Sequence, residues 1–292
     1  DDVVYEGESI YNYLKVQETD SSVLLSTNVA VGVQSVYMKQ GGLTGMYYDY
    51  ALAAPLMSEN PEQPEVLILG LGTGTYANQC LRYFPGCTVE GVEIDRDITE
   101  LAYRYFELSD QVRVTVEDGR AYLRQAGLYD VIMVDAYQDI TIPFQMSTVE
   151  FFSQVRSHLK PGGVMVVNMN MTSSGEGGIN EYLCDSIRSV FGCAVTVTVS
   201  NNTNTELFAS DDESMLARFE ENRAGLTDLA LLSQMQTVAN GLSPCEEGER
   251  ILTDDRAPVE LLGMRAIDEL LGDELDWVRD AIRRGDLSAI LG

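Results

Sequence analysis

The sequence predicts an α/β fold built on a doubly wound, mostly parallel sheet. Three observations predict it. Short apolar runs alternate with helical segments, a glycine-rich turn joins the first run to a helix, and acidic residues follow the later runs. Strands that alternate with helices at this spacing favour a parallel sheet that is covered on both faces.

The elements follow in order along the chain. Strands are expected over 66–69, 88–92, 112–116, 130–134 and 164–168, and two more near 194–199 and 206–209. Helices are expected over 76–83, 97–106, 121–125 and 148–159, and Pro161-Gly-Gly163 predicts a turn before the fifth strand. This alternation places the main domain at 46–210.

Two flanking parts complete the predicted organisation. Residues 1–45 contain near-alternating apolar positions separated by polar turns, which predicts a small β-meander. Residues 46–58 predict a helix with a proline near its far end, at the start of the main domain. Residues 211–292 are acidic and leucine-rich, which predicts a C-terminal helical extension.

Composition excludes several function classes. The chain of 292 residues has 46 acidic against 19 basic residues and a formal net charge of −27, which argues against nucleic-acid binding. A cationic substrate would be attracted, although acidity also serves solubility. The five cysteines lack metal-site spacing and are expected to be free thiols in a reducing compartment. The single histidine, His158, is expected at a helix end, so a histidine-dependent triad or zinc site is not indicated.

The strongest local motif is the turn Gly70-Leu-Gly-Thr-Gly74 between the first strand and its helix. Gly70, Gly72 and Gly74 let the backbone approach a ligand closely, and Thr73 lies among them. The amides of the following helix would face that ligand. A glycine turn that binds nothing is the alternative for this motif taken alone.

Acidic residues follow three further strands. Glu93 comes after the second strand, where a carboxylate can bind both ribose hydroxyls. Asp118, with Gly119, follows the third strand and is placed to accept a hydrogen bond from an adenine amino group. Asp135 follows the fourth strand, whereas Asp95 is expected to cap a helix. Each carboxylate alone could be a plain loop residue, but together they predict a nucleoside site at the carboxyl edge of a Rossmann-like class I methyltransferase fold.

Several motifs in order resemble the spermidine synthase family, the polyamine aminopropyltransferases. They are Tyr11-Asn12, Val33-Gln34, Tyr47-Tyr48-Asp49, Val66–Gly74, Val92-Glu-Ile-Asp95, Asp118-Gly119-Arg120 and Tyr129–Asp135, and together they span roughly residues 9–170. The runs Val134–Tyr137, Ile142–Phe144, Ser147-Thr148 and Leu252–Glu260 resemble a subgroup in which the domain follows a membrane-transporter-like segment.

The resemblance implies roles for individual residues. Glu93 would hold the ribose, Asp118 and Gly119 the adenine, while Gln34 and Tyr47 would line the pocket. Asp135 would belong to the catalytic loop that faces the sulfonium. The donor would be decarboxylated S-adenosylmethionine or S-adenosylmethionine, the acceptor a polyamine such as putrescine, and no metal would be needed. The family also implies a cytoplasmic homodimer, fused to or associated with a membrane segment in the subgroup.

Three positions depart from the family pattern. Thr73 replaces an aspartate that holds the amino end of the decarboxylated donor, and Gln138 replaces a second catalytic aspartate, with Asp139 one place further on. Asn12 stands where glutamine is usual. We expect Asp139 to substitute as a catalytic carboxylate. The alternatives are an S-adenosylmethionine-dependent methyltransferase of small molecules and a non-catalytic adenosyl- or polyamine-sensing domain.

The late pair Asp254-Asp255 has two interpretations. Pro258 suits the first turn of a helix, so the pair is expected to cap a helix that starts near Ala257. The alternative is that these carboxylates bind an amine.

Overall fold

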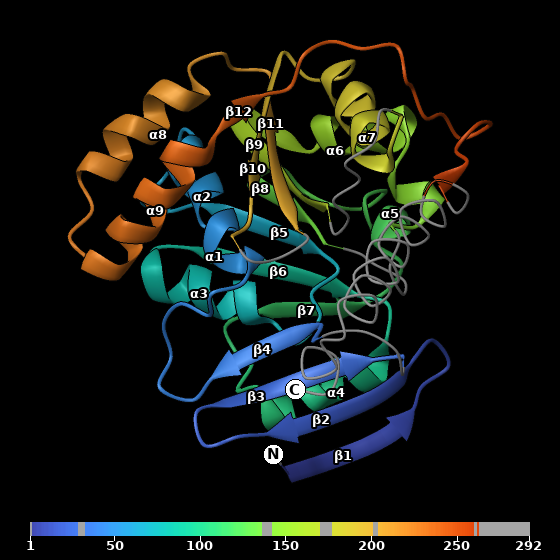
Figure 1. Cartoon of the computed structure of the whole chain (residues 1–292), viewed down its shortest axis with the longest axis vertical. Helices are drawn as coiled ribbons and strands as arrows, with labels where there is room; N and C mark the ends of the chain where they lie inside the picture. The colour runs from blue at the N-terminus through green and yellow to red at the C-terminus, as the bar shows by residue number, and fades with distance from the viewer. Residues whose placement is uncertain are drawn as a thin grey trace, which may run out of the picture.

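The computed structural model describes residues 2–28, 33–135, 142–169, 177–200, 204–259 and 262. At the N-terminus lies an antiparallel sheet of four strands in sequential order (Figure 1). Its strands are β1 (Asp2–Glu8), β2 (Tyr13–Glu18), β3 (Ser22–Thr27) and β4 (Ser35–Met38). The predicted β-meander is therefore confirmed.

The second sheet has the order β12-β10-β11-β9-β8-β5-β6-β7. Its strands are β5 (Glu65–Leu69), β6 (Thr88–Glu93), β7 (Arg113–Val116), β8 (Tyr129–Val134), β9 (Leu159–Met169), β10 (Cys193–Thr198), β11 (Thr205–Ser210) and β12 (Ser243–Pro244). The pairs β5–β6, β6–β7, β5–β8 and β8–β9 are parallel, whereas β9–β11, β10–β11 and β10–β12 are antiparallel. The parallel strands end at one edge, as the sequence predicts.

Helices cover both faces of this sheet (Figure 1). One core joins the sheet to α1 (Tyr47–Ala51), α2 (Ala53–Met57), α3 (Thr75–Tyr83), α8 (Met215–Ala224) and α9 (Leu229–Gly241). A second core lies on the other face, with α5 (Gly119–Tyr122), α6 (Val149–Ser157) and α7 (Ile179–Arg188). A third core packs α4 (Arg96–Tyr105) against the N-terminal sheet.

The helix expected over 46–58 is divided into α1 and α2. Pro55 lacks an N–H group and cannot donate to the carbonyl of Ala51, which would be its helical partner. The hydroxyl of Tyr76 donates to that carbonyl instead, at 3.1 Å. The break therefore leaves no unsatisfied carbonyl at this position and fastens α1 to α3.

Two further segments differ from expectation. Strand β9 begins at Leu159, so Pro161-Gly-Gly163 lies inside the strand rather than before it. After α9 the chain is not helical over 242–256; it adds β12 to the sheet. The backbone amides of Arg250 and Leu252 then donate to the side chains of Asp185 and Ser186 on α7, both at 2.9 Å. Side chains of α7 thus accept hydrogen bonds from backbone amides that would donate to backbone carbonyls in a helix.

In the part of the chain that the structure describes, no helix is both long enough and apolar enough to cross a bilayer.

The central strand β11 allows a test of this packing. Phe208 is fully buried, whereas Leu229 at the start of α9 is 80% exposed. We expect Phe208→Ala to lower the free energy of unfolding by about 3–5 kcal/mol, because it removes a buried ring and leaves a cavity. Leu229→Ala should change it by less than about 0.5 kcal/mol. Urea unfolding followed by circular dichroism measures both, and equal losses would contradict the assignment of Phe208 to the core.

Candidate active site

The glycine turn between β5 and α3 has a backbone that other residues would strain. Gly70, Gly72 and Gly74 have φ angles of 90°, 56° and 82°. A Cβ atom at Gly74 would clash with Cδ1 of Leu108. The turn is fixed to the next strand, because the amides of Gly70 and Leu71 both donate to the carbonyl of Val92 at 2.9 Å.

Glu93, the last residue of β6, lies directly beside this turn. Its carboxylate accepts a hydrogen bond from the amide of Gly72 at 2.8 Å and another from the amide of Asp95 at 3.0 Å. Burial raises the pKa of Glu93 above its usual 4.5, and the two amide hydrogen bonds oppose that rise. Two backbone groups therefore fix a nearly buried carboxylate against the glycine turn.

Asp95 is the N-cap of α4, as predicted, and accepts from the amide of Asp97 at 3.0 Å. Its second oxygen accepts from the Ser9 hydroxyl at 2.5 Å and from Nδ2 of Asn12 at 3.1 Å. Asn12 thus joins the N-terminal sheet to the edge of the central sheet, next to Glu93.

Asp118 and Gly119 lie at the end of β7. The Asp118 carboxylate caps α5 by accepting from the amide of Ala121 at 2.8 Å. A Cβ atom at Gly119 would lie 3.4 Å from Cβ of Leu69, the last residue of β5. The turn after β7 therefore approaches the end of β5 closely, and a larger residue would crowd it.

Asp135 follows β8 and receives two side-chain hydrogen bonds. The Tyr47 hydroxyl donates to Oδ2 at 2.6 Å, and Nδ2 of Asn168 donates to Oδ1 at 2.8 Å. Burial raises the pKa of Asp135 to about 7, the two hydrogen bonds oppose the rise, and the negative charge of Glu93 adds to it. A carboxyl group near half ionisation at neutral pH is suited to proton transfer.

Asn168 was not among the predicted site residues. It ends the apolar run of β9 in the same way that Asp135 follows β8, so the rule used for the carboxylates could have found it. Its Oδ1 accepts from Nδ2 of Asn204 at 2.7 Å. A chain of hydrogen bonds therefore runs from Asn204 through Asn168 to Asp135.

The other predicted residues are placed as follows. The carbonyl of Gln34 accepts from the Tyr48 hydroxyl at 2.7 Å, so this residue lies beside α1. Thr73 is buried, and its hydroxyl lies 3.4 Å from that of Thr75, which donates to the carbonyl of Val36. Gln138 and Asp139 lie outside the described residues. Over the part of the chain that the structure covers, no cluster of residues is suited to hold a metal ion.

Asp254 does not cap a helix near Ala257. It forms a bidentate ion pair with Arg120 at 2.8 and 2.7 Å and accepts from the Thr148 hydroxyl at 2.7 Å. Arg120 lowers the pKa of Asp254 below its usual value. The partner lies on α5, far away in sequence, which is why local capping rules gave the wrong assignment. His158, by contrast, is the C-cap of α6, as predicted.

Comparisons with known proteins indicate the same family that the sequence motifs resemble. A family model described as "Spermine/spermidine synthase domain" matches residues 46–204. The chain is 52% identical over 309 residues to a "Probable polyamine aminopropyl transferase" of Bifidobacterium longum, covering 99% of this chain and 68% of that protein. It is 28% identical to a "Polyamine aminopropyltransferase" of Vibrio vulnificus, covering 89% and 91%.

Among solved structures, the fold is similar to that of spermidine synthase from Thermotoga maritima. The TM-score is 0.67 with 20% sequence identity, over 82% of this chain and 84% of that one. This similarity supports the expected fold class.

The buried environment of Asp135 predicts a pH-dependent penalty in the free energy of unfolding. Its pKa of about 7 exceeds the ordinary 3.8, so the folded state binds the proton more tightly, and stability falls as pH rises from about 4 through 7. Asp135→Asn should remove this penalty and raise the free energy of unfolding at pH 8 by at most about 4 kcal/mol, with little gain near pH 4.

Asp130→Asn is the matched control. Asp130 is also buried, but Lys160 pairs with it at 3.0 Å, so the substitution should destabilise the protein at pH 8. Urea unfolding at both pH values measures the two effects. A stability of Asp135→Asn that follows the wild type at every pH would contradict the raised pKa.

Proposed function

The chain belongs to the spermine/spermidine synthase family, and on that premise we propose that it transfers an aminopropyl group from decarboxylated S-adenosylmethionine to a polyamine. The observation that carries the proposal is the Asp135 carboxyl group, held by Tyr47 and Asn168 beside Glu93 and the glycine turn. It provides a proton acceptor next to a site suited to a nucleoside.

The donor would occupy the edge formed by β5, β6 and β7. Glu93 would accept hydrogen bonds from the ribose hydroxyls, and Asp118 with Gly119 would contact the adenine. Gly70, Gly72 and Gly74 would allow the backbone to approach the nucleoside. Gln34 and Tyr47 would line the remaining wall. This arrangement would direct the sulfonium toward Asp135, because β8 lies next to β5 in the sheet.

The reaction is a displacement at carbon. The lone pair of an acceptor amine forms a C–N bond to the methylene carbon next to the sulfonium, the C–S bond breaks, and methylthioadenosine leaves as a neutral thioether. The amine loses one proton in the process, and Asp135 accepts it. Holding the amine and the carbon in line supplies a further part of the rate.

The pKa of Asp135 suits this role. An aliphatic amine has a pKa of about 10, as lysine does, so an ordinary aspartate would accept its proton with difficulty. Raising the pKa of Asp135 from 3.8 to about 7 reduces the difference between the pKa values of the amine and the carboxyl group by about three, which corresponds to about 4 kcal/mol. The burial that raises the pKa therefore makes Asp135 a more effective base.

Activity of an Asp135 variant tests the proposed base. Purified protein, decarboxylated S-adenosylmethionine and putrescine should yield methylthioadenosine and spermidine, which chromatography quantifies. Asp135→Asn should lower kcat by about 10²–10⁴-fold, because the amine loses its proton acceptor. Asp211→Asn, at an exposed residue paired with Arg156, is the control and should keep wild-type activity. Full activity of Asp135→Asn would exclude this role.

Thr73 gives a separate test of the donor. Calorimetry should show tighter binding of decarboxylated S-adenosylmethionine than of S-adenosylmethionine. Thr73→Asp should weaken S-adenosylmethionine further, by about tenfold or more, because the two carboxylates repel each other at close range. It should spare the decarboxylated donor and methylthioadenosine, which control for folding. A wild-type preference for S-adenosylmethionine, with methyl transfer to an acceptor, would support a methyltransferase instead.

A further inference from the structure

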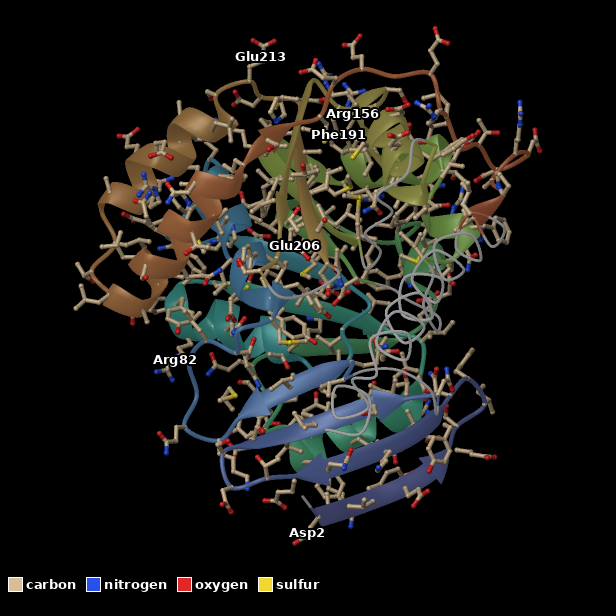
Figure 2. All side chains as sticks on the ribbon, in the orientation of Figure 1. Asp2, Arg82, Arg156, Phe191, Glu206 and Glu213 are labelled. Carbon is tan, nitrogen blue, oxygen red and sulfur yellow. The ribbon has the colours of Figure 1, made fainter. Side chains whose placement is uncertain are left out.

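Glu206 is a second buried carboxyl group close to Asp135, and the mechanism above does not use it. It lies on β11, and its Cα is paired with that of Asn168 on β9 and with that of Val197 on β10. Its side chain is completely buried. Figure 2 shows Glu206 in the interior of the molecule, whereas Glu213 lies at the periphery.

Both carboxyl oxygens of Glu206 lack a hydrogen-bond partner among the described residues. Directly paired strand residues share a face, so Glu206 projects to the face of Val197 and Asn168, and Phe208 follows on that face two residues later. Burying a polar group without a hydrogen bond costs free energy. An apolar residue would pack there without this cost, so stability does not explain a glutamate.

Asn168 connects Glu206 to the Asp135 site. It donates to Asp135 on one side, and its backbone pairs with that of Glu206 on the other. Neighbouring strands lie about 4.8 Å apart, so the backbones of Asp135 and Glu206, two strands apart, are separated by about 10 Å. The two carboxyl groups, which their side chains carry away from these backbones, are therefore separated by a distance of the order of the length of a short extended diamine.

The negative charge of Asp135 also acts electrostatically on Glu206. Burial raises the pKa of Glu206 well above its usual value, and the charge of Asp135 adds to the rise. No lysine or arginine forms an ion pair with either group among the described residues. Within the described part of the chain the pair therefore forms an acidic site that no protein cation neutralises, and a ligand that carries positive charge would relieve its repulsion.

We infer that Glu206 binds the ammonium group at the far end of the polyamine acceptor, while Asp135 faces the amine that attacks the donor. This inference rests on the proposed function and assigns the acceptor's second charge to a specific residue. Because Glu206 is shielded from water, an ion pair formed there is weakly screened. Glu206 thereby selects diamines and longer polyamines over monoamines of the same length.

Kinetics with two acceptors test the inference. Putrescine carries an ammonium group at both ends, whereas 1-aminobutane has the same carbon chain with only one. Wild-type protein should prefer putrescine in kcat/KM. Glu206→Gln should raise the KM for putrescine by at least about 30-fold, the lower range for removing one partner of a buried charge pair. It should leave 1-aminobutane kinetics and the KM of the donor within about twofold of wild type.

Glu213→Gln, the same change at an exposed residue, is the matched control and should keep the putrescine preference. Glu206→Leu addresses a purely structural role: a residue that only fills space would give a more stable protein with unchanged KM for putrescine, which would overturn the inference. Thermal shifts with methylthioadenosine verify that each variant keeps its nucleoside site. If Glu206→Gln cannot be purified, Glu206→Asp should still raise the KM for putrescine, and an unchanged KM would refute the assignment.

The outcomes separate the two proposals. A wild-type protein that transfers aminopropyl groups to neither amine refutes the proposed function. A wild type that is active on putrescine, together with a Glu206→Gln variant that retains the same KM and the same preference over 1-aminobutane, refutes only the inference about Glu206.

Discussion

The hydrogen bonds that Tyr47 and Asn168 donate to Asp135 are the interactions on which the organisation of the site depends. They join α1, β8 and β9 at the edge where the parallel strands end. No cation pairs with Asp135 among the described residues, so neutral donors alone hold a carboxyl group whose ionisation burial disfavours. This weak compensation leaves its pKa about 7, in the range that proton transfer at neutral pH requires.

The distribution of charge in the site follows from this choice of neutral donors. Glu93, Asp135 and Glu206 all have raised pKa values, and burial is the largest cause for each. Both proposed substrates carry positive charge, one as a sulfonium and the other as ammonium groups. Substrates that bring cations into an acidic, poorly solvated site can make the interactions that the protein itself leaves unmade. The net charge of −27 would favour their approach over a longer range.

Two flanking parts of the chain are fastened to the central sheet beside the site. The N-terminal sheet is fastened through Ser9 and Asn12 to Asp95, close to Glu93. The segment after α9 is fastened through Asp254 to Arg120, next to Gly119. Each contact ends beside a residue of the proposed nucleoside site. The flanking parts of the chain therefore help to position the turns after β6 and β7, although they contribute no strand to the parallel part of the sheet.

The sequence by itself determined which segments form the parallel strands and which polar residues follow them. Parallel strands end at one edge, so Glu93, Asp118 and Asp135 could be grouped without a structure. Only the tertiary structure decided that Asn168 holds Asp135, that Asp254 pairs with Arg120, and that the buried Glu206 has no hydrogen-bond partner among the described residues. Those contacts join segments far apart in the chain, and antiparallel pairing of β11 with β9 sets the face that Glu206 occupies. Local patterns encode the period of a strand but not the register of its distant neighbour.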